Sequence, residues 1–170
     1  MESIANFTIE KPTKKISKNL ARFCENSGIA YPFSIKPIQT GRNSKVYQIE
    51  KNGSKWILKK YYKQEADPRN RLKTECDFLS FLNKNGIEHV AKAIGSDIDH
   101  NWGLYSYLPG KKPASVNSNF IKQAAEFILK INAHRNHPEA KNLPIASEAC
   151  FSINDHLKCV QKRVNILKEI

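Results

Sequence analysis

Long runs of apolar residues are missing from this sequence. No segment approaches the roughly 18 consecutive apolar residues that a membrane-spanning helix needs. The first residues, MESIAN, contain no apolar stretch of the kind found in secretory signal peptides. Internal repeats and low-complexity tracts are also missing. These absences predict a soluble, cytoplasmic protein without a membrane partner.

Cysteine is scarce and is not spaced for metal binding. The four cysteines, Cys24, Cys76, Cys150 and Cys159, form no C-x-x-C pair. We therefore predict no metal site, and reduced thiols suited to the cytoplasm. Cys76 lies within a helical pattern and is expected to be a small core residue.

Acidic residues are outnumbered by basic ones. There are 16 Asp and Glu against 28 Lys and Arg, which gives a net charge of +12. This balance favours anionic partners such as nucleic acid, acidic lipid or a phosphorylated small molecule, although a general richness in lysine gives the same total. The basic residues are scattered rather than gathered in one arm, which makes nucleic acid an unlikely partner.

Strand and helix patterns alternate in the first part of the chain. Apolar residues at helical spacing predict a short helix that ends at Ser27-Gly28. Strand patterns follow over residues 34–40, 46–49 and 56–59. Asn52-Gly53, between the last two, predicts a two-residue hairpin turn.

A second helix, two strands and a helical region complete the chain. Asp67-Pro68 predicts the start of the helix and Asn85-Gly86 its end. The expected strands are residues 93–94 and 104–108, and the later helices are residues 120–131 and 153–170. We therefore expect an α+β fold, with residues 1–110 as one unit and residues 111–170 as the start of a helical unit.

The order of these elements, with four short motifs, resembles the N-terminal lobe of aminoglycoside phosphotransferase and choline kinase-like enzymes, which share the protein kinase-like fold. The motifs are TGRNSKVY at residues 40–47, ILKKY at 57–61, RLKTE at 71–75 with Phe78-Leu79, and YLPG at 107–110. Their order and spacing carry the resemblance. It implies a kinase-like N-lobe, made of an antiparallel sheet and one helix, followed by the first helices of an incomplete C-lobe.

Only one glycine, Gly41, occupies the loop where protein kinases have three. A turn between two strands can still direct backbone N–H groups at a phosphate. Asn43 and Ser44 could add side-chain donors. A plain surface turn is the alternative for this loop.

Strand alternation separates two adjacent lysines, Lys59 and Lys60, because they face opposite sides of the sheet. A two-residue turn pairs Val46 with Lys59, so that Lys59 shares a face with Val46 and Ile57. The resemblance implies that this face covers the adenine and that Lys59 holds phosphate. A register slip of one residue would select Lys60 instead.

Glu75 lies on the helical stripe formed by Leu72, Leu79 and Leu82, which is expected to face the sheet. A buried carboxylate is costly unless it is paired. We therefore predict an ion pair with Lys59, the alternative being a solvated glutamate at the margin of the stripe. The resemblance implies that this pair directs Lys59 toward the nucleotide phosphates.

Residues 105–110 correspond to the hinge that binds adenine in the family resembled. The resemblance implies that the Ser106 carbonyl and the Leu108 amide make these contacts. An ordinary strand end is the alternative interpretation.

The catalytic pattern H-x-D-x-x-x-x-N is missing from this sequence. The nearest string, His134-Arg135-Asn136, has asparagine in place of the base and is expected to be the end of a helix. We assign no catalytic residue, and we expect the chain by itself to release no ADP from ATP, since binding phosphate does not by itself lower the barrier.

The resemblance implies the nucleotide-binding portion of a phosphotransferase that uses ATP or GTP, with Mg²⁺ and a small hydroxyl-bearing substrate in the complete enzyme. A non-catalytic nucleotide- or protein-binding module and a basic nucleic-acid-binding protein are the alternatives. The apolar face of the last helix is expected to be partly exposed or buried in a homodimer. Its residues are Leu157, Val160, Val164 and Leu167.

Overall fold

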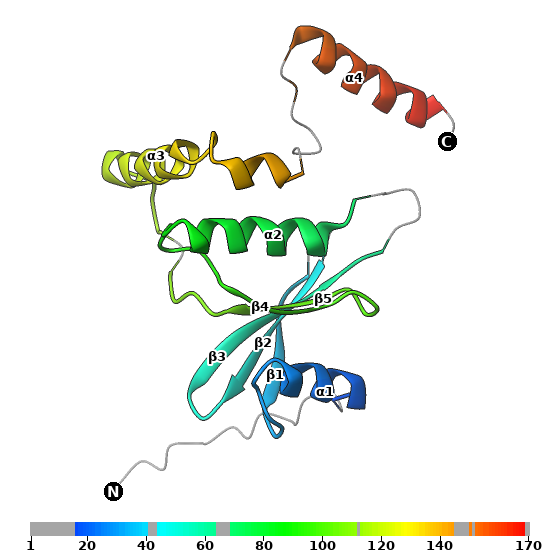
Figure 1. The fold of residues 1–170 in the computed structure, drawn as a ribbon, viewed down its shortest axis with the longest axis vertical. Coiled ribbons are helices and arrows are strands. Elements are labelled where there is room, and N and C mark those ends of the chain that lie inside the picture. Colours follow the sequence, from blue (N-terminus) through cyan, green and yellow to red (C-terminus); the bar gives the residue numbers. More distant parts are fainter. Residues whose placement is uncertain are drawn as a thin grey trace, which may run out of the picture.

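The computed structural model describes residues 16–40, 44–63, 69–111, 113–144, 150 and 152–168. The elements, in chain order, are α1 (Lys18–Asn26), β1 (Ser34–Thr40), β2 (Ser44–Lys51), β3 (Ser54–Tyr61), α2 (Arg71–Lys84), β4 (Ala93–Asp97), β5 (Trp102–Ser106), α3 (Ser118–Ala133), the 3₁₀ helix η1 (Pro138–Asn142) and α4 (Ile153–Lys168). The five strands form one antiparallel sheet in the order β1-β2-β3-β5-β4 (Figure 1). The fold is α+β and agrees with a kinase-like N-lobe followed by part of a helical region.

The β2–β3 hairpin has the predicted register. Asn52 and Gly53 have φ angles of 49° and 77°, as a two-residue type I′ turn requires. Lys51 pairs with Ser54, and Val46 therefore pairs with Lys59. Because side chains alternate along a strand, this register decides which residues face each side of the sheet.

One face of the sheet packs against α1. The buried cluster on this face joins the helix to β2, β3 and β5, and contains Phe23, Cys24, Ile29, Phe33, Ile49, Leu58, Trp102 and Leu104. As predicted, α1 ends at Ser27-Gly28, where Gly28 has a φ angle of 87°. Apolar burial is the main force that holds this helix on the sheet.

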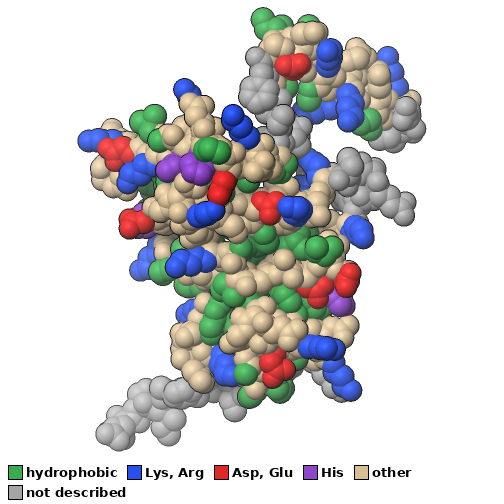
Figure 2. All heavy atoms as spheres, in the orientation of Figure 1, with side chains coloured by type: hydrophobic (Ala, Val, Ile, Leu, Met, Phe, Trp, Pro, Cys, Tyr) green, Lys and Arg blue, Asp and Glu red, His purple; other side chains and the backbone are tan. Residues whose placement is uncertain are grey.

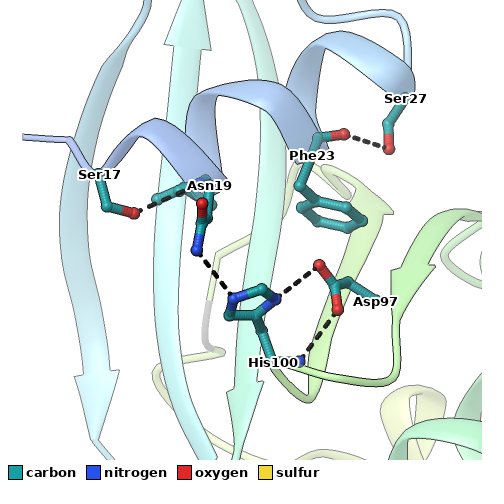
Figure 3. A network of polar contacts seen from close by, with 7 residues as sticks. Ser17, Asn19, Phe23, Ser27, Asp97 and His100 are labelled. Carbon is teal, nitrogen blue, oxygen red and sulfur yellow. Dashed lines mark hydrogen bonds and ion pairs between the residues drawn. The ribbon is translucent and has the colours of Figure 1, made fainter.

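A polar network also ties α1 to the turn between β4 and β5 (Figure 3). The His100 ring Nδ1 lies 2.9 Å from Asp97 Oδ2, and the backbone N–H of His100 donates to Asp97 Oδ1 over 3.0 Å. The other ring nitrogen lies 3.1 Å from the amide nitrogen of Asn19, on α1. The ring also stacks on Trp102, with centroids 4.4 Å apart.

The helix α2 lies on the opposite face of the sheet (Figure 1). It starts later than predicted: Asn70 is the N-cap, its side chain accepting from the backbone N–H of Lys73, and Arg71 is the first helical residue. Asp67-Pro68 lies outside the described residues. The prediction that the helix starts there is wrong, because its N-cap is Asn70. The end at Asn85-Gly86 is as predicted, with Gly86 at a φ angle of 71°.

The stripe prediction for α2 missed one large residue. Leu72 and Leu82 are buried as expected, but Phe81 is buried as well. Phe81 joins Leu82 and Ile87 in a second cluster that packs against α3, η1 and the residue after η1, through Phe127, Ile131, Ala140 and Leu143. The helix therefore holds the sheet on one side and the helical part of the chain on another.

Several predicted boundaries need correction. The strand expected at residues 104–108 is Trp102–Ser106, because Trp102 and Gly103 pair with Lys60 and Lys59, while Tyr107 and Leu108 lie beyond the ladder. The helix expected over residues 120–131 is longer, Ser118–Ala133, whereas α4 begins at Ile153 as expected and is described as far as Lys168. His134 caps the end of α3, as expected for that string.

Candidate functional site

Lys59 and Glu75 form an ion pair between β3 and α2. Their side chains are 28% and 32% exposed, so the pair lies at the edge of the interior rather than within it. Lys60 is exposed on the opposite face of the strand. The predicted ion pair is thus confirmed, and so is the prediction that Lys59 rather than Lys60 faces the helix that carries Glu75.

Glu75 is held from a second direction by Tyr61. The Tyr61 hydroxyl donates to Glu75 Oε2 over 2.5 Å, while Lys59 binds Oε1. Lys59 and Tyr61 are two residues apart on β3, so both side chains extend from the same face of the strand. The two oxygens of one carboxylate are therefore shared between two residues of one strand.

A second tyrosine extends this network into the sheet. The hydroxyl of Tyr105, on β5, lies 2.8 Å from that of Tyr61, and Cys76 Sγ lies 3.5 Å from the Tyr105 hydroxyl. Burial, followed by the hydrogen bond to Glu75, raises the pKa of Tyr61 far above its ordinary value. Burial likewise raises the pKa of Tyr105 and of Cys76. All three groups therefore keep their protons near neutral pH.

Gly103 leaves the space that Tyr105 needs. A Cβ atom at Gly103 would lie 2.5 Å from the Tyr105 hydroxyl oxygen and 2.7–2.8 Å from its ring. Gly103 pairs with Lys59 across the strands, and the Lys59 ammonium lies 5.3 Å from the centre of the Tyr105 ring. The missing side chain thus allows a ring to lie beside the lysine.

The remaining predicted residues lie around this network to different degrees. Val46 and Ile57 are half-buried and share the Lys59 face. The buried side chain of Gln48 lies on the same face, opposite Ile57 in the β2–β3 ladder. Ser44 begins β2 and pairs with Tyr61. Gly41 and Asn43 lie outside the described residues.

The predicted hinge follows directly from β5. Ser106 is the last residue of the strand, and its backbone N–H donates to the Lys92 carbonyl over 2.9 Å. Leu108, two residues later, is 47% exposed. None of the contacts that the structure describes joins either residue to the Lys59–Glu75 pair.

A cleft of about 560 Å³ opens beside Glu75. It lies between the first half of α2 and the residues at the end of η1. Its lining residues are Arg69, Asn70, Arg71, Lys73, Thr74, Glu75, Asp77, Asn142 and Pro144. Glu75, which holds Lys59, therefore also lines this cleft.

Sequence reasoning missed Tyr61, Tyr105, Cys76 and Gly103. Two signals were present: Tyr61 stands at the same-face position next to Lys59, and a glycine inside a strand often marks a close approach. Among the described residues, no three His, Cys, Asp or Glu side chains lie together as metal ligands would. The described helices include none long and apolar enough to span a bilayer.

Residues 34–149 match the phosphotransferase enzyme family. The match covers more than half of the chain and includes the whole sheet, α2, α3 and η1. The chain therefore belongs to this family. No curated protein matches the sequence.

Proposed function

We infer that this chain is the nucleotide-binding portion of an ATP-dependent phosphotransferase that acts on a hydroxyl group of a small molecule. The observation that carries the proposal is the Lys59–Glu75 ion pair, which joins β3 to α2 in a member of a phosphotransferase family. In kinases such a pair presents the lysine to the nucleotide phosphates. The division at residues 110 and 111 is part of this proposal.

The proposed nucleotide site lies on the Lys59 face of the sheet. Val46 and Ile57 would cover the base, and Lys59, positioned by Glu75, would bind the phosphates of ATP or GTP. Ser106 and Leu108 would contact the base through their backbone groups. Gly41, Asn43 and Ser44 would lie nearest the phosphates.

The Mg²⁺ expected in the complete enzyme is not assigned ligands. Within the described ranges no cluster of three carboxylate, thiol or imidazole groups fits a metal ion.

We also propose that the exposed face of α4 pairs with a second copy of the chain. Sedimentation velocity of the wild type and of Leu157→Asp would test this, and a monomer at all concentrations would exclude it.

Titration of the ¹⁵N-labelled chain with ATP, followed by NMR, tests the nucleotide site. We expect shifts at Val46, Ile57 and residues 106–108, and a loss of affinity in Lys59→Met. Lys60→Met is the matched control, because that side chain faces the other side of the sheet. Shifts confined to α3 and α4 would contradict the proposal. Tighter, strongly salt-dependent binding of an oligonucleotide would favour a nucleic-acid partner instead.

A further inference from the structure

We propose that Tyr61, supported by Tyr105, is a positioning residue that holds Glu75 and thereby directs Lys59 at the nucleotide phosphates. This inference rests on the proposed function and assigns a role to two side chains for which no role was predicted. It is carried by the hydrogen bonds that connect β3, β5 and α2 behind the ion pair.

The direction of each hydrogen bond follows from the groups present. The Glu75 carboxylate can only accept, so the Tyr61 hydroxyl must donate to it. The only hydroxyl hydrogen of Tyr61 is used in that bond, so the Tyr61 oxygen must accept a hydrogen bond from the Tyr105 hydroxyl. The Tyr105 oxygen is left to accept from the Cys76 thiol. The chain of donors thus runs in one direction and ends on the carboxylate, where it stabilises the charge that attracts Lys59.

The burial of the residues explains why the tyrosines control the geometry. Lys59 and Glu75 are each about three-tenths exposed, and an ion pair of two flexible, partly exposed side chains defines its geometry weakly. Tyr61 and Tyr105 are 7% and 1% exposed. A buried ring has little freedom, so the carboxylate is fixed from the interior and the ammonium follows it.

The first experiment needs no nucleotide. Limited acetylation, read by mass spectrometry, compares Lys59 with its neighbour Lys60 in the same molecule. In Tyr61→Phe we expect the rate at Lys59 to rise severalfold while the rate at Lys60 stays constant, because the lysine is held less firmly. Tyr47→Phe is the matched control, since Tyr47 packs in the cluster on the opposite face of the sheet.

The second experiment separates positioning from general support of the fold. Affinities for ATP, ADP and adenosine are measured in the wild type and in Tyr61→Phe. We expect ATP and ADP to bind about tenfold more weakly, roughly the value of one hydrogen bond to a charged group, and adenosine to bind equally well. In a Lys59→Met background, the Tyr61 substitution should have no further effect on ATP.

The outcomes distinguish the positioning role of Tyr61 from the proposed binding of nucleotide by the chain. Unchanged labelling of Lys59, or an equal loss for ATP and adenosine, would overturn the positioning role. A wild-type chain that binds neither ATP nor adenosine would overturn the proposed function. It would also overturn the claim that Tyr61 directs Lys59 at nucleotide phosphates. If Tyr61→Phe does not fold, as judged by circular dichroism, the same measurements on Tyr105→Phe decide the question.

Discussion

Apolar side chains are buried in one region of the molecule and exposed in another. The first region is the sheet with α1 and α2, and the second consists of α3 and α4. Ile49, Leu104 and Tyr105 of the sheet are at most 1% exposed. In α3 and α4, by contrast, none of the described residues is buried. Leu129 and Leu157 are 68% and 60% exposed, and Figure 2 shows hydrophobic and basic side chains together on the surface of α4. The first region completes its own core, while the second presents apolar faces that it does not cover.

The largest difference between the two regions should appear when a leucine is truncated in each. Leu104→Ala removes a fully buried side chain and should lower the free energy of unfolding by about 2–5 kcal/mol. Leu157→Ala, on α4, should change it by less than about 0.5 kcal/mol at concentrations at which the chain is a monomer, because Leu157 is 60% exposed in the single chain. Urea unfolding measures both. Equal losses in the monomer would mean that Leu157 is buried within the single chain in solution.

Cysteine reactivity should separate the regions next. Burial raises the pKa of Cys24 from 9.0 to about 11, which lowers its thiolate fraction at pH 8 about a hundredfold. Cys159, on α4, is half-exposed. Iodoacetamide should modify Cys159 quickly and leave Cys24 intact until the chain is unfolded. Rapid modification of Cys24 in the folded chain would show that α1 separates readily from the sheet.

A methyl group at Gly103 should damage the sheet region at the site itself. Gly103→Ala places a carbon 2.5 Å from the Tyr105 hydroxyl, and the buried ring must shift. We expect a loss of about 1–3 kcal/mol, typical of overpacking. Gly110→Ala is the stability control, because no atom lies within 4 Å of a Cβ atom there. Similar melting temperatures for both variants would contradict this account of the close approach.

The smallest effect on stability is expected at the polar network that ties α1 to the turn between β4 and β5, and this effect depends on pH. Burial acts to raise the pKa of Asp97, but hydrogen bonds from the backbone and ring of His100 outweigh it and lower the pKa. The carboxylate therefore contributes stability above its ordinary pKa near 4, and this contribution is lost as pH falls through the lowered value.

Asp97→Asn should accordingly cost less than about 1 kcal/mol at pH 7, and the difference from wild type should shrink at pH 3. Thermal melts at both pH values provide the measurement. A difference that grows on acidification would have the wrong sign for this explanation.

The sequence was sufficient to predict the Lys59–Glu75 pair because local rules determine its geometry. A two-residue Asn52-Gly53 turn permits one hairpin register, and that register decides which of two lysines faces α2. A glutamate within an apolar stripe then needs a cationic partner on the facing strand. The ends of α1 and α2 are also determined locally, because Gly28 and Gly86 adopt the positive φ angles that end a helix.

Other features depend on contacts between distant residues, which local patterns do not contain. The start of α2 at Arg71 rather than at Pro68, and the extension of β5 back to Trp102, were mispredicted because caps and ladders depend on the neighbouring chain. Phe81 is buried in a cluster that packs against α3, a contact that no pattern within α2 predicts.

By itself, therefore, the sequence determined the α+β class, the hairpin register and the ion pair. The register follows from one turn, and the pair follows from that register together with a glutamate in the apolar stripe of the helix. Only the tertiary structure decided that Tyr61 and Tyr105 stand behind the carboxylate. The two tyrosines are 44 residues apart in the sequence, and their hydroxyls meet at 2.8 Å, where Gly103 leaves room for the Tyr105 ring. Such a meeting results from burial against a common partner, α2, and not from any local preference of the two strands.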